Sequence, residues 1–425
     1  MALTLQNGSS LATVSAPADN PALRRFALAT AAATFALVWA GGLVTSHGAG
    51  LAVPDWPNTY GYNLFFFPFS QWLGGIFFEH THRLIASGVG LLTTILALWM
   101  FGRKSRPVLR WGGALLLLAG LAALFFTPQS LPATASATAG AIGNQQSTGH
   151  SSLEDDLMLL AVGAAALAGS FVWPKCEPSP KWLRRLGVLA FFAVVAQGVL
   201  GGLRVTMLKD QLGIFHATLA QVFFVLMCAI ALFHTAFWRN LPAQAEDGAV
   251  RLRGWFLAAT LLILGQLALG ATMRHQHAGL AIPDFPAAYG KIWPDTSPAA
   301  VLGYNQQRIE VEGYAPITAF QIVLQMVHRL AAGIIVVMVG AGAWLARREL
   351  GPRHRLSRLA SGWLLLIVAQ VFLGAATIWT GKTADIATAH VACGALSLAM
   401  GGMISIICNY SGRVPCCGAG TSYEF

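Results

Sequence analysis

Two short stretches of this chain place an imidazole beside a guanidinium at the start of a long apolar run. The first is Glu-His-Thr-His-Arg at residues 79–83, and the second is Gln-Met-Val-His-Arg at residues 325–329. Residues three and four apart share one face of a helix, so Glu79, His82 and Arg83 point the same way. Ionisable groups are costly to bury at the mouth of an apolar helix, and they usually mark a functional site.

The composition is that of a membrane protein. The chain has 425 residues, of which 56% are hydrophobic and 10% are charged, whereas a soluble domain carries about 25% charge. The formal net charge of +10 would suit a nucleic-acid partner, but the Lys and Arg residues form short clusters between apolar runs. That pattern is typical of cytoplasmic membrane loops, and we therefore exclude nucleic acid as a partner.

The apolar runs predict an all-α polytopic protein with eight to ten transmembrane helices. The runs lie near residues 26–46, 77–101, 111–127, 157–173, 186–207, 212–237, 254–273, 318–346, 360–380 and 384–408. A span needs about 20 apolar residues, so the sequence leaves open whether the short runs at 111–127 and 157–173 both cross. Every second connection is basic, which places both termini in the cytoplasm whichever number is right.

The ends of the chain predict its location. The first 20 residues are polar and lack the basic start and apolar core of a cleaved signal, while Arg24 and Arg25 alone make a poor transit peptide. This favours the bacterial cytoplasmic membrane over the mitochondrial inner membrane, with cytoplasmic tails at residues 1–24 and 411–425. The six cysteines show no paired metal-ligand spacing and none falls in a predicted outer loop, so we expect no structural disulfide.

The chain repeats itself. Ala-Gly-Leu-Ala-Val-Pro-Asp-Trp-Pro at residues 49–57 returns as Ala-Gly-Leu-Ala-Ile-Pro-Asp-Phe-Pro at 278–286, and His-Arg-Leu at 82–84 returns at 328–330. We predict two tandem four-helix bundles, residues 25–240 and 250–410, related by a pseudo-twofold axis along the membrane normal. The first half carries an insert at about 108–180, predicted to be a helical hairpin with a flexible polar loop at 129–156.

Each half places a histidine near the outer start of two helices, His82 with His216 and His328 with His390. Two neutral imidazoles that face each other across a four-helix bundle can ligate one haem iron axially. The sequence therefore predicts two haem sites toward the outer face of the membrane.

The residues around these histidines differ between the halves. Arg83 and Arg329 each follow their histidine and are candidates to bind haem propionates. Glu79 lies three residues before His82, whereas Gln325 holds that place in the second half. A carboxylate can stabilise positive charge or move a proton, and an amide can do neither. This predicts one reactive haem and one that relays electrons, although Glu79 could instead only pair with Arg83.

Other polar residues have simpler interpretations. Three glutamines, each four residues before a glycine, are predicted to be helix-packing contacts, and three outer histidines are predicted to be solvated. Two aspartates, each between prolines, are predicted to hold tight loops. These residues are Gln197, Gln266 and Gln370; His47, His275 and His277; and Asp55 and Asp284.

Taken together, the Glu-x-x-His-Arg signature, the paired loops, the tandem halves and the four histidines resemble the haem A synthase family over nearly the whole chain outside the insert. The resemblance implies oxidation of a ring methyl of haem o to a formyl group by successive hydroxylation. It also implies that Glu79 is the catalytic carboxylate, that His82 and His216 hold the substrate haem, and that His328 and His390 ligate a haem b cofactor.

The implied partners are haem o, the enzyme that produces it, and a membrane electron acceptor, either a quinone or a cytochrome; a homo-oligomer is compatible with the sequence. Some family members carry a cysteine pair in an outer loop that this chain lacks, so a redox role for that pair does not transfer. Two alternatives remain: a dihaem b-type electron carrier without substrate chemistry, and a transporter with parallel repeats whose histidines relay protons. The difference between Glu79 and Gln325 favours the enzyme.

Overall fold

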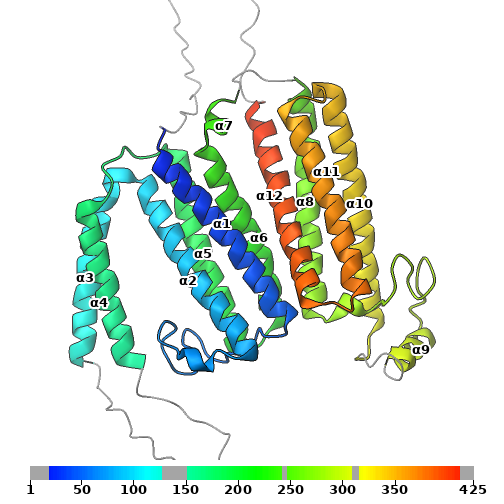
Figure 1. Ribbon diagram of the computed structural model, residues 1–425, viewed down its shortest axis with the longest axis horizontal. Coiled ribbons are helices and arrows are strands. Elements are labelled where there is room, and N and C mark those ends of the chain that lie inside the picture. Colours follow the sequence, from blue (N-terminus) through cyan, green and yellow to red (C-terminus); the bar gives the residue numbers. More distant parts are fainter. Residues whose placement is uncertain (1–18, 127–150, 242–246, 309–314, 412–425) are drawn as a thin grey trace, which may run out of the picture.

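The computed structural model describes residues 19–126, 151–241, 247–308 and 315–411, and the described residues form helices and loops without strands. Within these ranges, ten helices are long and apolar enough to cross a membrane. The predicted all-α polytopic fold is therefore confirmed. Figure 1 shows these helices side by side and roughly parallel to one another.

Four helices of the first half pack around one another: α1 (Pro21–Ser46), α2 (Gly74–Met100), α5 (Lys181–Met207) and α6 (Asp210–Phe233). Met100, Leu183 and Met227 lie fully buried in the core of this bundle. Helix α1 begins inside the predicted tail of residues 1–24, because the Asn20 side chain caps it by accepting a hydrogen bond from the Leu23 N–H at 3.0 Å.

The second half forms an equivalent bundle from α8 (Asp247–His275), α10 (Ala319–Leu350), α11 (Arg355–Trp379) and α12 (Ala384–Ser411). Its core contains Phe256, Trp363 and Ile404, all fully buried. Between the bundles, α12 packs against α1 and α6, and α6 packs against α8. The contact of α1 with α12 thus has its counterpart in the contact of α8 with α6, as expected for two parallel repeats.

The insert forms a separate hairpin of α3 (Ser105–Phe126) and α4 (Ser151–Val172), which pack on each other beside the first bundle in Figure 1. The two helices approach closely at a glycine: a Cβ on Gly113 would lie 2.7 Å from the Leu167 backbone nitrogen. Both helices are long enough to span. The predicted loop at 129–156 was too long at its end, because α4 already begins at Ser151 with Glu154 in its first turn, where a negative charge suits the helix dipole. Residues 127–150 lie outside the described part of the chain.

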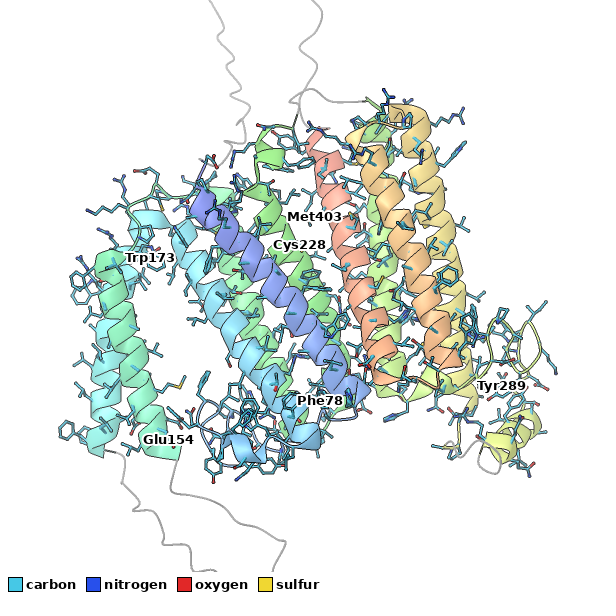
Figure 2. The ribbon with its side chains drawn as sticks, in the orientation of Figure 1. Phe78, Glu154, Trp173, Cys228, Tyr289 and Met403 are labelled. Atoms are coloured by element: carbon cyan, nitrogen blue, oxygen red, sulfur yellow. The ribbon has the colours of Figure 1, made fainter. Side chains whose placement is uncertain are left out.

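Short elements lie between the long helices. They are η1 (Phe69–Gln71), η2 (Gly102–Lys104), α7 (Ala236–Arg239), η3 (Ala278–Leu280) and α9 (Pro298–Gln307). Helix α9 lies outside the predicted helices, although its N-cap Ser297 and first-turn Pro298 are ordinary helix-start signals. The segments that follow α1 and α8 lie at the same end of the molecule, where Figure 2 labels Phe78 and Tyr289. We call it the loop end.

The buried indole of Trp363 provides a test of the second core. Trp363 is fully buried and donates a hydrogen bond to the Ser397 carbonyl at 2.9 Å. We expect Trp363→Ala to lower the free energy of unfolding by about 3–5 kcal/mol, because it leaves a cavity and an unpaired acceptor. Trp344→Ala is the matched control, since Trp344 on α10 is 59% exposed, and it should change stability by about 0.5 kcal/mol or less. Thermal unfolding of the purified protein in detergent measures both, and equal midpoints would contradict the packing described here.

Candidate haem-binding sites

The four predicted histidines lie near the loop end of four helices. His82 is on α2, His216 on α6, His328 on α10 and His390 on α12, and all four helices begin at the lower end of Figure 1. His82 lies within electrostatic range of His216, and His328 within range of His390. The fold therefore brings together the two members of each predicted pair, while iron ligation stays a prediction.

Each imidazole lies against a glycine of the helix that precedes it. A Cβ added to these glycines would meet the histidine Cε1 atom at 3.0–3.5 Å. The pairs are Gly41 with His82, Gly201 with His216, Gly270 with His328 and Gly374 with His390. The absence of a side chain lets each ring lie directly on a helix backbone, which fixes its orientation. The same glycine–histidine contact thus occurs in each of the four helix pairs, two in each half of the chain.

The three glutamines predicted as packing contacts also hold the histidines. Gln197 donates to the His216 carbonyl at 3.2 Å, and Gln266 donates to the His328 carbonyl at 2.9 Å. The prediction of simple packing was therefore incomplete, because these glutamines also make hydrogen bonds with the histidines. Each glutamine lies one turn before the glycine that contacts the imidazole ring. In α1 the equivalent position, four residues before Gly41, is Leu37, so His82 lacks this support.

The protonation pattern suits metal binding at His390. Its Nδ1 lies 3.1 Å from the Gln370 carbonyl, and a hydrogen bond there requires a proton on Nδ1, which leaves a lone pair on Nε2. The Gln370 side-chain nitrogen lies 3.5 Å from that Nε2, and a metal bound there would replace this long contact. The Nδ1 atoms of the other three histidines are buried without a hydrogen-bond partner in the described residues, although all four side chains are partly exposed. Two imidazoles per bundle, each with its Nδ1 edge buried, are a donor set that fits bis-histidine haem.

Glu79 is buried one turn before His82. One carboxylate oxygen accepts the Val53 N–H at 2.9 Å, and the other accepts from Arg83 at 2.8 Å. In the second half, Gln325 accepts the Ile282 N–H at 2.6 Å. The carboxylate and the amide therefore make the same contact with the loop that lies over their site.

Arg83 and Arg329 also bind these loops. Arg83 donates to three backbone carbonyls, of Val53, Asp55 and Asn58, as well as to Glu79. Arg329 likewise donates to the carbonyls of Asp284 and Ala287. The four terminal N–H groups of Arg83 are thus already used within the protein. Propionate binding by either arginine stays a prediction.

We call residues 49–61 and 278–290 the repeated loops. Asp55 accepts hydrogen bonds from the Tyr60 and Gly61 N–H groups, both at 2.8 Å. Asp284 accepts from the N–H groups of Tyr289 and Gly290 in the same way. The prediction that the two aspartates hold tight loops is confirmed. In the first loop the Trp56 ring lies on Gly202 of α5, so this loop joins α5 to the Arg83 end of α2.

Two histidines differ from expectation. His275 was predicted to be solvated, but its side chain is only 11% exposed and lies 3.8 Å from Asp210. The reason is that α8 continues to His275 and its ring packs on Gly213 of α6, between the bundles. His80, to which the sequence assigned no role, is 1% exposed and shares a hydrogen bond with Thr59 at 3.2 Å. His47 and His277 are exposed, as predicted.

Comparisons with known proteins agree with this architecture. Residues 157–401 match the family described as cytochrome oxidase assembly protein; this range contains His216, His328 and His390 and begins after Glu79 and His82. The chain is 30% identical to the heme A synthase of Rhizorhabdus wittichii over 253 residues, which are 57% of this chain and 67% of that protein.

The chain is also 32% identical to the heme A synthase of Symbiobacterium thermophilum over 224 residues, covering 50% of this chain and 65% of that protein. A third relative, the heme A synthase of Geobacillus kaustophilus, is 27% identical over 211 residues, covering 48% of this chain and 58% of that protein. The matches thus span about two thirds or less of each relative. Because the family match covers more than half of its residues, the chain belongs to the cytochrome oxidase assembly protein family.

Proposed function

We propose that this protein is a haem A synthase that oxidises a ring methyl of haem o to a formyl group. The observation that carries the proposal is the difference between two otherwise equivalent sites. Both have a pair of imidazoles and a loop pinned by an arginine, but only the first has a buried carboxylate, Glu79, where the second has Gln325. The names of the relatives support this function.

His82 and His216 would hold haem o as the substrate, on rings fixed by Gly41 and Gly201. Two successive hydroxylations of one methyl carbon, followed by loss of water, leave a formyl group. Each hydroxylation removes electrons from that carbon, so positive charge develops there. Glu79 would stabilise this charge or take the proton of the attacking water, because a carboxylate acts strongly in a site of low dielectric.

His328 and His390 would ligate haem b, which when bound supplies one-electron transfer. The hydrogen bond between His390 and the Gln370 carbonyl would orient the ring and keep the lone pair on Nε2, where iron would replace the 3.5 Å contact with the Gln370 side-chain nitrogen. The electrons would pass to a membrane quinone or cytochrome, and the haem o-producing enzyme would deliver the substrate. The loop end, and with it both sites, would lie on the outer side of the bacterial cell membrane, because the Lys/Arg distribution predicts cytoplasmic termini.

A dihaem b-type electron carrier is the second candidate. It is favoured by the full engagement of Glu79 with Val53 and Arg83, which is what a purely structural carboxylate would show. In that case Glu79 and Gln325 would serve only to hold the repeated loops.

Glu79→Gln separates the two functions. Gln325 shows that an amide can accept the loop N–H at this position, so we expect the variant to fold and to bind haem. Loss of the carboxylate should lower haem a formation by about 100-fold or more, the usual effect of removing one stabilising group from an active site. The measurement is the ratio of haem a to haem o in pigments extracted from cells that co-express a haem o source.

The reciprocal change, Gln325→Glu, is the matched control and should leave haem a formation unchanged if the second site performs no oxidation. Undiminished haem a in Glu79→Gln would remove Glu79 from catalysis and favour the electron carrier.

The glycines under the histidines give a second prediction, for the cofactor site. A Cβ on Gly374 would lie 3.0 Å from His390 Cε1, closer than nearly all real contacts, whereas a Cβ on Gly270 would lie an ordinary 3.5 Å from His328 Cε1. We expect Gly374→Ala to tilt the His390 ring and, with haem b bound, to shift its low-temperature electron paramagnetic resonance g-values in the oxidised form. Gly270→Ala should leave them nearly unchanged. Identical spectra for both variants would show that these contacts do not set the ligand orientation.

A further inference from the structure

Arg204, near the loop end of α5, is a partly buried arginine whose guanidinium has no hydrogen-bond or ion-pair partner anywhere in the described ranges of the chain. A guanidinium carries five N–H donors, and leaving it unpaired away from water is costly. Its neighbours differ in this respect. Arg83 is fully engaged, and Arg274 donates to the Gly42 carbonyl at 3.1 Å and to the Ser46 hydroxyl.

The guanidinium lies between the first repeated loop and the first histidine pair. A Cβ on Gly50 would lie 2.5 Å from Arg204 Nη2 and 2.9 Å from Nη1, so the group rests directly on the loop backbone. Arg204 also follows Gly201, the contact of His216, by one turn of α5. It is within electrostatic range of His82, His216 and Glu79. This cation therefore borders the proposed substrate site on its loop side.

The second half has a cation in the equivalent place, supplied by a different segment. Gly279 is the counterpart of Gly50, and a Cβ there would lie 3.6–4.0 Å from the Cδ, Cε and Nζ atoms of Lys382. Lys382 lies in the turn between α11 and α12, and its ammonium has no hydrogen-bond partner among the described residues. Burial, and then the charge of Arg274, lower the pKa of Lys382, as expected for a cation that lacks an anion.

We propose that Arg204 binds a propionate of the substrate haem and that Lys382 binds a propionate of the cofactor haem. This inference rests on the proposed function and deepens it. Among the described residues, each cation lies unpaired against a glycine of a repeated loop. Arg204 is within electrostatic range of His82 and His216, and Lys382 lies in the turn that leads into α12, the helix of His390. A carboxylate is the anion that a guanidinium binds best, through two parallel hydrogen bonds. Arg83 and Arg329 then have a different task, which is to hold the repeated loops.

The chemistry of haem o adds a consequence for selectivity. The methyl group that becomes the formyl shares its pyrrole ring with a propionate. A residue that binds this propionate restrains the neighbouring methyl. Glu79 and Asp210 are both within electrostatic range of Arg204, but only Glu79 is buried, one turn from His82, whereas the Asp210 side chain is 61% exposed. Arg204 is therefore a positioning residue, which selects the edge of the ring that is presented to Glu79.

The test uses the purified full chain with haem b already bound. This protein is titrated with haem o and, in a separate experiment, with the dimethyl ester of haem o. Affinity is read from the Soret difference spectrum. We expect Arg204→Gln to weaken haem o binding by about tenfold to a hundredfold, the value of a charge-assisted hydrogen bond. The ester should bind wild type and variant equally weakly, because it lacks the carboxylate. Arg204→Lys should restore part of the affinity, and haem b content should stay unchanged.

Matched variants control for folding. Gly50→Ala retains the charge but places a methyl 2.5 Å from Arg204 Nη2, so it should displace the guanidinium and weaken haem o binding. Gly279→Ala makes only ordinary contacts with Lys382, at 3.6 Å or more, and should leave haem b content unchanged. Lys382→Gln should lower haem b content while sparing haem o affinity.

Two results would overturn the inference: equal haem o affinity in wild type and Arg204→Gln, or an ester that still distinguishes the two proteins. A wild-type protein that binds no haem o would instead overturn the proposed function, and the role of Arg204 with it.

Discussion

The fold depends on the contact between an imidazole and a helix backbone, repeated four times. A histidine that is to ligate a metal inside a bundle needs its ring held at a fixed angle with one nitrogen free. Here a glycine on a neighbouring helix lets the Cε1 edge of the ring lie against the backbone, at Gly41, Gly201, Gly270 and Gly374. One turn before the glycine on α5, α8 and α11, a glutamine makes a hydrogen bond with the histidine that the glycine contacts. These are Gln197 with His216, Gln266 with His328 and the Gln370 carbonyl with His390. Because these contacts lie at helix–helix interfaces, the sites and the bundles form together.

The repeated loops show why the difference between the halves is informative. The Val53 N–H needs an acceptor, and so does the Ile282 N–H; a carboxylate provides it in one half and an amide in the other. Loop geometry is thus satisfied by either side chain, and the second half shows that it needs no charge. Even paired with Arg83, a buried carboxylate has a desolvation cost that an amide of the same shape avoids. Keeping it at Glu79 is therefore better explained by chemistry at the first site than by the folding of its loop.

The sequence predicted the features that depend on local pattern. Helical periodicity, the repeat and the positive-inside rule were enough for the bundles, and the shared helix face brought Glu79, His82 and Arg83 to one place. Features that depend on tertiary contact were missed. Gln197 and Gln266 differ from packing residues only in what they face, and the burial of His275 depends on Gly213 of another helix. The sequence does not show which arginines have partners: Arg83 and Arg274 bind backbone carbonyls in the described part of the folded structure, whereas Arg204 does not.

The choice of cation at the two loop edges agrees with the two roles proposed for the haems. A substrate must enter, be held in one orientation and leave, so its edge needs a group that fixes direction. Arginine does this through a planar fork, whereas lysine acts as a flexible point charge. The first site has Arg204 on the rigid backbone of α5, and the second has Lys382 in a turn. A cofactor that stays bound would need charge balance more than orientation, because His328 and His390 would already hold its iron. The same asymmetry that separates Glu79 from Gln325 thus recurs, independently, in the groups that would hold the propionates.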